Sequence, residues 1–219
     1  MKTQEKNFDG IKLSGFTAIL IMLALTGTAI YLLSLPQTPS IIAGVICGIC
    51  VVVMLPGFMI IQPNNSRVLT FFGRYAGTVI SNGFYWVNPL FLKSTVTLRI
   101  LNLNIDPIKV NDKVGNPIMI GVVWRIKDTY KASFDISGNI REFVQIQSDA
   151  ALRQVAGMYA YDTNETIDKV TLRSDESGEI TQRLEDELNS RLAIAGIEIV
   201  EARINYLAYA SEIASVMLR

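Results

Sequence analysis

The 219-residue sequence contains no histidine and only two cysteines, Cys47 and Cys50. The lack of histidine excludes Ser-His-Asp triads, H-E-x-x-H zinc sites and imidazole general bases. No G-x-x-x-x-G-K-[ST] motif is present and no G-x-G-x-x-G follows a predicted strand, so nucleotide binding has no support. We therefore predict a protein that is not an enzyme and that uses no metal and no cofactor.

Charge is also absent from a long part of the chain, because no Asp, Glu, Lys or Arg lies within residues 13–66. Residues 15–35 and 41–61 are both long enough to cross about 30 Å of hydrocarbon at a rise of about 1.5 Å per residue. They predict a two-span membrane hairpin over 13–66, preceded by an N-terminal segment at 1–12. A cleaved signal peptide and a buried hairpin in a soluble core are the alternatives. The first lacks a cleavage site and the second lacks polar helix faces.

Basic residues flank the uncharged run on both sides. Lys2, Lys6 and Lys12 precede it, Arg67 and Arg74 follow it, and the connecting turn carries no charge. Because basic flanks stay on the cytoplasmic side, both ends of the hairpin are expected in the cytoplasm. The protein would then be an integral membrane protein, of the inner membrane if the source is bacterial.

Two motifs inside the second span have competing interpretations. Cys47 and Cys50 have C-x-x-C spacing, but thiol redox chemistry needs a solvent-accessible thiolate, which the middle of a bilayer does not offer. Gly44 and Gly48 form a G-x-x-x-G motif that lets helix backbones approach closely. We expect these glycines to pack within the hairpin, with a dimerisation face as the alternative.

After the membrane segment, the hydrophobic period changes from helical to two, and helices follow later. We predict an α+β fold over residues 67–207 and the start of a long C-terminal helix over 208–219. A slip in the alternation predicts a bulge or bend between Ile100 and Leu101. Strands are expected at residues 68–73, 83–87, 95–105, 117–127 and 197–206, and helices at residues 140–157 and 180–195.

The order of motifs in residues 60–219 resembles the SPFH superfamily, which includes the stomatin, prohibitin, flotillin and band 7 proteins. A strand ending in Phe72-Gly73-Arg74 precedes the loop at residues 82–89, where Asn82 occupies a position at which the family commonly has proline. The resemblance implies a membrane anchor, a compact α+β domain and a C-terminal coiled-coil helix. Further matching stretches lie at residues 98–99, 112–117, 143–159 and 188–207.

The loop region of this resemblance contains three consecutive aromatic residues, Phe84, Tyr85 and Trp86. In a strand they cannot all face one side, so at least one faces away from the core of the domain. Tyrosine and tryptophan favour the membrane interface, and we predict that these residues and Pro89 lie near the bilayer. The alternative is that all three pack inside a small twisted sheet.

These features predict a non-enzymatic membrane scaffold, and the resemblance implies a large homo-oligomer, a ring or cage, that organises membrane microdomains. It also implies membrane proteases or other membrane proteins as partners. An accessory subunit of a channel or transporter is the alternative function, although such pathways usually contain ionisable residues within the spans. The net charge of zero gives no electrostatic case for nucleic acid or for a polybasic lipid-binding segment. Mixed charges at residues 173–191 are a candidate subunit contact.

Overall fold

A computed structural model of the chain describes residues 4–104, 108–109, 117–156 and 178–207. The chain divides into two compact units, residues 1–98 and residues 99–219. The predicted helix start at 208–219 and the predicted helix end at Gly157 lie outside the described residues.

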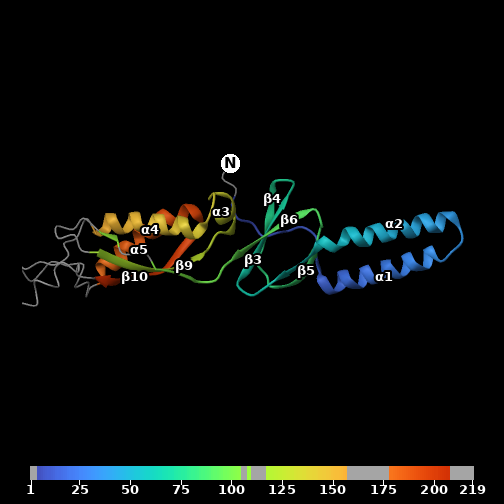
Figure 1. Ribbon diagram of the computed structural model, residues 1–219, viewed down its shortest axis with the longest axis horizontal. Helices are drawn as coiled ribbons and strands as arrows, with labels where there is room; N and C mark the ends of the chain where they lie inside the picture. Colours follow the sequence, from blue (N-terminus) through green and yellow to red (C-terminus); the bar gives the residue numbers. More distant parts are fainter. Residues whose placement is uncertain (1–3, 105–107, 110–116, 157–177, 208–219) are drawn as a thin grey trace, which may run out of the picture. The chain divides into compact units, whose positions relative to one another are not determined.

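The first unit contains two apolar helices, α1 (Gly15–Leu33) and α2 (Thr38–Met54), which lie side by side and antiparallel (Figure 1). The second helix ends seven residues before the predicted end of the span. A short 3₁₀ helix, η1 (Leu55–Gly57), follows, and the strand β2 (Phe58–Ile61) begins directly after it. Pro56 explains the early end, because proline in a helix removes a backbone hydrogen bond and clashes with the preceding turn.

Two three-stranded antiparallel sheets complete this unit. One has the order β1-β5-β2 and the other the order β4-β3-β6. Buried side chains of β2, β3, β4 and β5 form the core, and Phe8 packs against it. The remaining strands are β1 (Lys12–Ser14), β3 (Asn65–Phe71), β4 (Arg74–Val79), β5 (Gly83–Val87) and β6 (Phe91–Thr97).

The strand predicted at residues 95–105 is divided in the structure. Strand β6 ends at Thr97 in the first unit, and β7 (Leu101–Asn104) belongs to the sheet of the second. The slip in alternation at Ile100 and Leu101 therefore marks the passage from one sheet to another. Of the two predicted alternatives, the bend describes the structure, since the chain bends at Arg99 between two separate strands. Strands β1 and β4 were not predicted.

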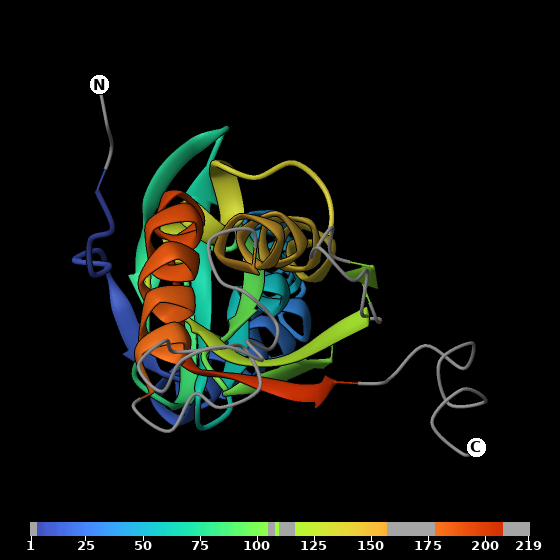
Figure 2. The ribbon, with the colours of Figure 1, turned by 90° about the vertical axis from the view of Figure 1, so that its left-hand side faces the viewer.

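The second unit is a sheet with the order β10-β9-β7, to which β8 (Ile108–Lys109) adds by pairing with β9. Helices α4 and α5 pack against each other, and α5 packs on β10, so one face of the sheet is covered (Figures 1 and 2). The elements are β9 (Pro117–Ile126), α3 (Thr129–Phe134), α4 (Ile140–Ala156), α5 (Glu179–Leu192), η2 (Ala193–Ala195) and β10 (Ile197–Leu207).

The predicted periodicities account for the core of this unit. The apolar residues that recur every four positions along α5 are all buried, as are the alternate residues of β9 from Ile120 to Ile126. Gly196 adopts a left-handed conformation (φ +67°) just after the helix, as a C-terminal glycine does. The Asn139 side chain accepts a hydrogen bond from the Arg141 backbone N–H at 2.9 Å, as an N-cap residue does.

Candidate functional site

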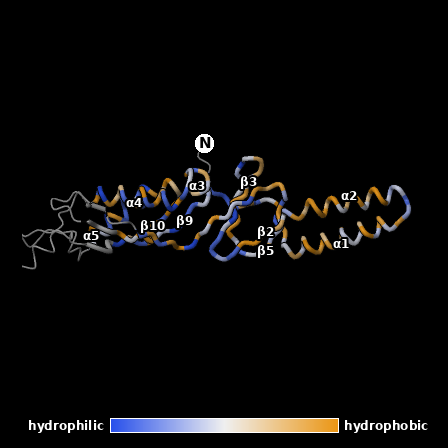
Figure 3. Tube along the Cα trace, viewed as in Figure 1, coloured by the Kyte–Doolittle hydropathy of each residue, from blue (hydrophilic) through white to orange (hydrophobic). Residues whose placement is uncertain are grey.

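The outer surfaces of α1 and α2 are apolar. Both helices are long and apolar enough to cross a membrane, judged by length and composition, and only 11% of each hydrophobic window is buried (Figure 3). A core helix of a soluble protein would bury most of that surface. Exposed large side chains include Phe16, Leu20, Leu23, Ile42, Ile49 and Val52.

The two glycines of the predicted G-x-x-x-G motif have different surroundings. A Cβ atom at Gly44 would lie 2.9 Å from the side chain of Leu33 and 3.2 Å from the carbonyl oxygen of Ala29, so this glycine permits close packing of α2 on α1. A Cβ atom at Gly48 would meet no atom within 4 Å in the part of the chain that the structure describes. Within that part, only the Gly44 end of the motif therefore lies at the contact between the helices.

The aromatic residues of β5 alternate between two sides of the strand. Phe84 stacks on Phe58, with 5.6 Å between ring centroids, and meets Phe16 edge-on at 5.5 Å. Trp86, two residues further on, donates a hydrogen bond from Nε1 to the carbonyl oxygen of Met54 at 2.9 Å. Phe84 and Trp86 therefore pack against the start of α1 and the end of α2, at the base of the apolar helices.

Tyr85 lies on the other side of β5 and packs against the core of the first unit. Its hydroxyl donates to the Asn82 carbonyl oxygen at 3.1 Å, and Lys12 Nζ lies 4.8 Å from the centre of its ring. All three aromatic residues are half-buried, as is Pro89 in the following turn. Tyr85 therefore packs with the core of the first unit, whereas Phe84 and Trp86 contact the ends of the apolar helices, and the position of these residues near the bilayer stays a prediction.

The N-terminal segment is built into the same sheets, which the sequence reasoning missed. The Phe8 backbone N–H donates to the Thr78 carbonyl oxygen at 3.0 Å, and the Thr78 N–H donates to the Lys6 carbonyl oxygen at 2.9 Å. Gly77 (φ +145°) permits this approach, because a Cβ atom there would lie 2.7 Å from Cα of Phe8. Strand β1 then pairs with β5 immediately before α1 begins.

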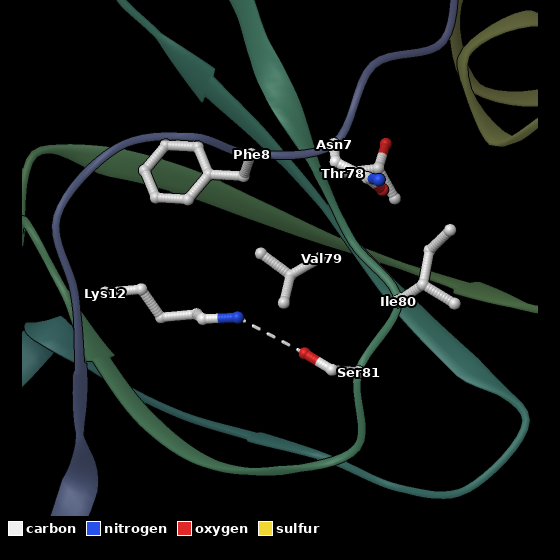
Figure 4. Close-up of a pocket in the computed structure, with 7 residues that line it drawn as sticks. All are labelled: Asn7, Phe8, Lys12, Thr78, Val79, Ile80 and Ser81. Atoms are coloured by element: carbon white, nitrogen blue, oxygen red, sulfur yellow. Dashed lines mark hydrogen bonds between the residues drawn. The ribbon is translucent and has the colours of Figure 1, made fainter.

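A pocket of about 460 Å³ lies between this N-terminal segment and β4 (Figure 4). Within it, Lys12 Nζ donates to Ser81 Oγ at 3.3 Å. The residues that line the pocket include no carboxylate, thiol or imidazole. The full lining is Asn7, Phe8, Lys12, Thr78, Val79, Ile80 and Ser81.

A search of curated proteins found no relative. The family model described as SPFH domain / Band 7 family matches residues 59–219. The chain belongs to this family. The resemblance inferred from the sequence is therefore confirmed, and the match begins inside β2, directly after the apolar helices.

Band 7 proteins are generally membrane-associated scaffolds without enzymatic activity. A search of the described residues for three or more His, Cys, Asp or Glu side chains that could hold a metal found none. Cys47 and Cys50 are both free thiols on α2.

In the second unit, charged side chains pair with one another on the face of the sheet opposite helices α4 and α5. Glu198 on β10 accepts from Lys127 Nζ and from Arg125 Nε on β9, both at 2.7 Å. These hydrogen bonds, that of Lys127 first, hold the pKa of Glu198 below its ordinary value. On α5, Arg191 donates to Glu187 at 2.6 Å, so this part of the predicted contact at 173–191 is already paired within the chain.

Proposed function

We propose that this Band 7 protein is an integral membrane scaffold that is anchored by α1 and α2. The two helices would cross the bilayer as a hairpin, with the Band 7 domain on the cytoplasmic side. The observation that carries the proposal is the pair of antiparallel, uncharged helices whose large apolar side chains are exposed beside a Band 7 domain. Exposed apolar surface of this extent needs a lipid or protein cover.

The N-terminal segment supports the hairpin topology. Residues 7–14 precede α1 and pair with β4 and β5, which follow α2. A pairing between these segments requires both to lie on the same side of a membrane, because neither can pair through the hydrocarbon. The basic residues on both flanks favour the cytoplasm as that side.

The base of the helices supports a membrane-proximal position for the aromatic residues of β5. Phe84 and Trp86 contact the ends of α1 and α2 at the place where a spanning helix leaves the hydrocarbon. Tryptophan favours this depth because its ring is apolar and its N–H is polar. Leu90 and Leu92, which are 57% and 69% exposed, add apolar surface to the adjoining turn and strand.

Self-assembly into a large homo-oligomer with cyclic symmetry completes the proposal. Anchoring to a membrane raises the effective concentration of a domain, so weak side-by-side contacts can close a ring. In the described residues, β10 is an edge strand, and Val200 on it is 46% exposed, which suits lateral contacts. Such a ring would organise a membrane microdomain and position membrane proteases or other membrane proteins.

Mass photometry of the full chain in mild detergents and in native nanodiscs tests assembly. We expect a large oligomer, and a weaker one for a chain that ends at Leu207, which lacks the predicted C-terminal helix start. A full chain that stays monomeric or dimeric in all of these conditions would contradict the scaffold proposal.

Cysteine labelling tests the topology separately. In a Cys47→Ser, Cys50→Ser background, Thr38→Cys should react only from outside the cell and Gln182→Cys only from the cytoplasm. Labelling of Gln182→Cys from outside would overturn the orientation and leave the hairpin in place.

A further inference from the structure

A second pocket, of about 410 Å³, lies next to the residues that follow α2 and is lined by two basic side chains. Lys93 and Arg67 supply the charges, and Phe58 and Phe84 supply apolar walls. None of the lining residues is acidic, so neither cation has a carboxylate partner in the pocket. The lining consists of Pro56, Phe58, Met59, Ile60, Arg67, Phe84 and Lys93.

The strand register places the two cations next to each other. Arg67 on β3 is paired with Thr95 on β6, and Lys93 lies two residues before Thr95. Residues two apart on a strand share a face, so Arg67 and Lys93 are diagonal neighbours on one side of the sheet. Their like charges repel, and this repulsion is not compensated within the pocket.

Lys93 is held at the end of the helix. Its Nζ donates to the carbonyl oxygen of Pro56 and, at 3.4 Å, to that of Phe58. Burial lowers the pKa of Lys93, and the positive charge of Arg67 lowers it further. An anion in the pocket would reverse the second effect, since it would favour the charged form of both side chains.

Arg67 keeps unused hydrogen-bonding capacity. Its Nε is buried and has no hydrogen-bond partner in the described structure, and its terminal nitrogen reaches the Ile60 carbonyl oxygen only at 3.5 Å. A third pocket, of about 300 Å³, touches the same side chain from the direction of Thr95. A buried, unpaired guanidinium N–H is a donor that a phosphate oxygen can satisfy.

The surrounding charge has the same sign. No Asp or Glu lies within residues 10–105, although five basic residues do. Residues 1–98 as a whole contain six basic and two acidic residues, a net charge of +4, which the acidic excess of the second unit offsets. The net charge of zero for the whole chain therefore hides the positive charge of the unit that contains both apolar helices.

We propose that this pocket binds a phosphate group, and that the headgroup of an anionic phospholipid supplies it. The guanidinium of Arg67 suits a phosphate because it can donate two parallel hydrogen bonds, and Lys93 adds a point charge. Phe58 and Phe84 lie where the glycerol and upper acyl carbons of such a lipid would follow. The inference rests on the proposed membrane anchor, since the pocket adjoins the end of α2.

Native mass spectrometry of the full chain, released from nanodiscs that contain equal amounts of phosphatidic acid and phosphatidylcholine, tests the inference. We expect the protein to retain phosphatidic acid preferentially, because its phosphate is terminal and more negative. The variants Arg67→Gln and Lys93→Gln should each lower this preference about tenfold, because each removes a charge-assisted hydrogen bond to the phosphate. Arg67→Lys keeps the positive charge but cannot donate two parallel hydrogen bonds, so this variant should lose part of the preference for phosphatidic acid.

Arg74→Gln is the matched control, because it removes the same charge from an exposed position of the same unit that does not line the pocket. Its lipid preference should equal that of the wild type. An equal loss in Arg74→Gln and Arg67→Gln, or a wild type without preference, overturns the pocket. A wild type that shows no preference for phosphatidic acid overturns the proposal even if the variants fail to fold.

Two further arms separate the possible failures. Inorganic phosphate, added to protein in pure phosphatidylcholine nanodiscs, probes a soluble source, and a thermal shift from phosphate without any lipid preference overturns the lipid as the source. Alkaline carbonate extraction of cell membranes tests the anchor itself. Protein that stays in the membrane but shows no lipid preference refutes only this inference, whereas extracted protein refutes the anchor.

Discussion

Replacement of Gly196 by alanine should destabilise the second unit by more than the cost of holding an alanine in a left-handed backbone conformation, because the added Cβ atom also meets other atoms. Gly196 has φ +67°, and its carbonyl oxygen accepts hydrogen bonds from the backbone N–H groups of Lys127 at 2.8 Å and Asp128 at 3.0 Å. A Cβ atom there would lie 2.5 Å from the Asp128 carbonyl oxygen and 3.0 Å from Cβ of Lys131. The first contact is with backbone, which cannot move aside without breaking those hydrogen bonds.

Gly178 provides a matched control. It has nearly the same conformation (φ +68°), yet a Cβ atom at this position would meet no atom of the described residues within 4 Å. The left-handed conformation costs an alanine about 1 kcal/mol at either site. At Gly196, the overpacking adds about 1–3 kcal/mol. We therefore expect a loss of about 1 kcal/mol for Gly178→Ala and of about 2–4 kcal/mol for Gly196→Ala.

Urea unfolding of the full chain in mild detergent measures the difference. Trp86 lies in the first unit and Trp124 in the second, so a Trp86→Phe background makes the fluorescence of Trp124 report on the second unit alone. The additional loss in Gly196→Ala should lower the midpoint by about 0.5–1.5 M urea relative to Gly178→Ala, for an m-value of about 2 kcal/mol/M. Equal midpoints for the two variants would show that Asp128 does not crowd this position, and the packing described here would be wrong.

Three other changes have expected outcomes. Leu188→Ala, at a fully buried position of α5, should cost about 2–5 kcal/mol in the same assay; a loss under 1 kcal/mol would contradict its core position. Glu198→Gln should lower the free energy of unfolding at neutral pH by about 0.5–1 kcal/mol, because the partners Lys127 and Arg125 lose their carboxylate. Since the pKa of Glu198 is lower in the folded state, this difference should vanish as pH falls below about 4, and a difference independent of pH would refute the assignment. Phe8→Ala should expose the N-terminal segment to limited proteolysis, whereas unchanged cleavage would show that Phe8 does not hold it.

The sequence predicts those helices and strands whose regularly spaced apolar residues are all buried in the same hydrophobic core. The spacing of Ile180, Leu184 and Leu188 predicts α5 because every member of the row is buried against the same sheet. Gly196 marks the end of the helical region because a left-handed residue is needed there. The apolar helices follow from the absence of charge, and the start of α4 follows from the side chain of Asn139.

Features that depend on distant partners could not be predicted in this way. Lys12 to Ser14 form a strand only because β5 supplies an edge for it, so no local alternation marks them. The split at Leu98 to Ile100 has the same local pattern as a bulge, and only tertiary structure separates the two. The cationic pocket combines Arg67 and Lys93, which are 26 positions apart in sequence. The absence of acidic residues from 10–105 could have indicated a basic site in this part of the chain. The net charge of zero for the whole chain hides this local excess of positive charge.

The pairing of the N-terminal segment with β4 and β5 has a consequence for biogenesis. Residues 7–14 are synthesised before either apolar helix, but their partners in β4 and β5 are synthesised only after both. The first unit therefore cannot close until the ribosome has passed Val87. In the proposed hairpin, the N-terminal residues would have to stay on one side of the membrane while α1 and α2 insert. A nascent chain that translocated its N-terminus would separate β1 from β5 permanently, leaving an unpaired sheet edge for proteolytic quality control to detect.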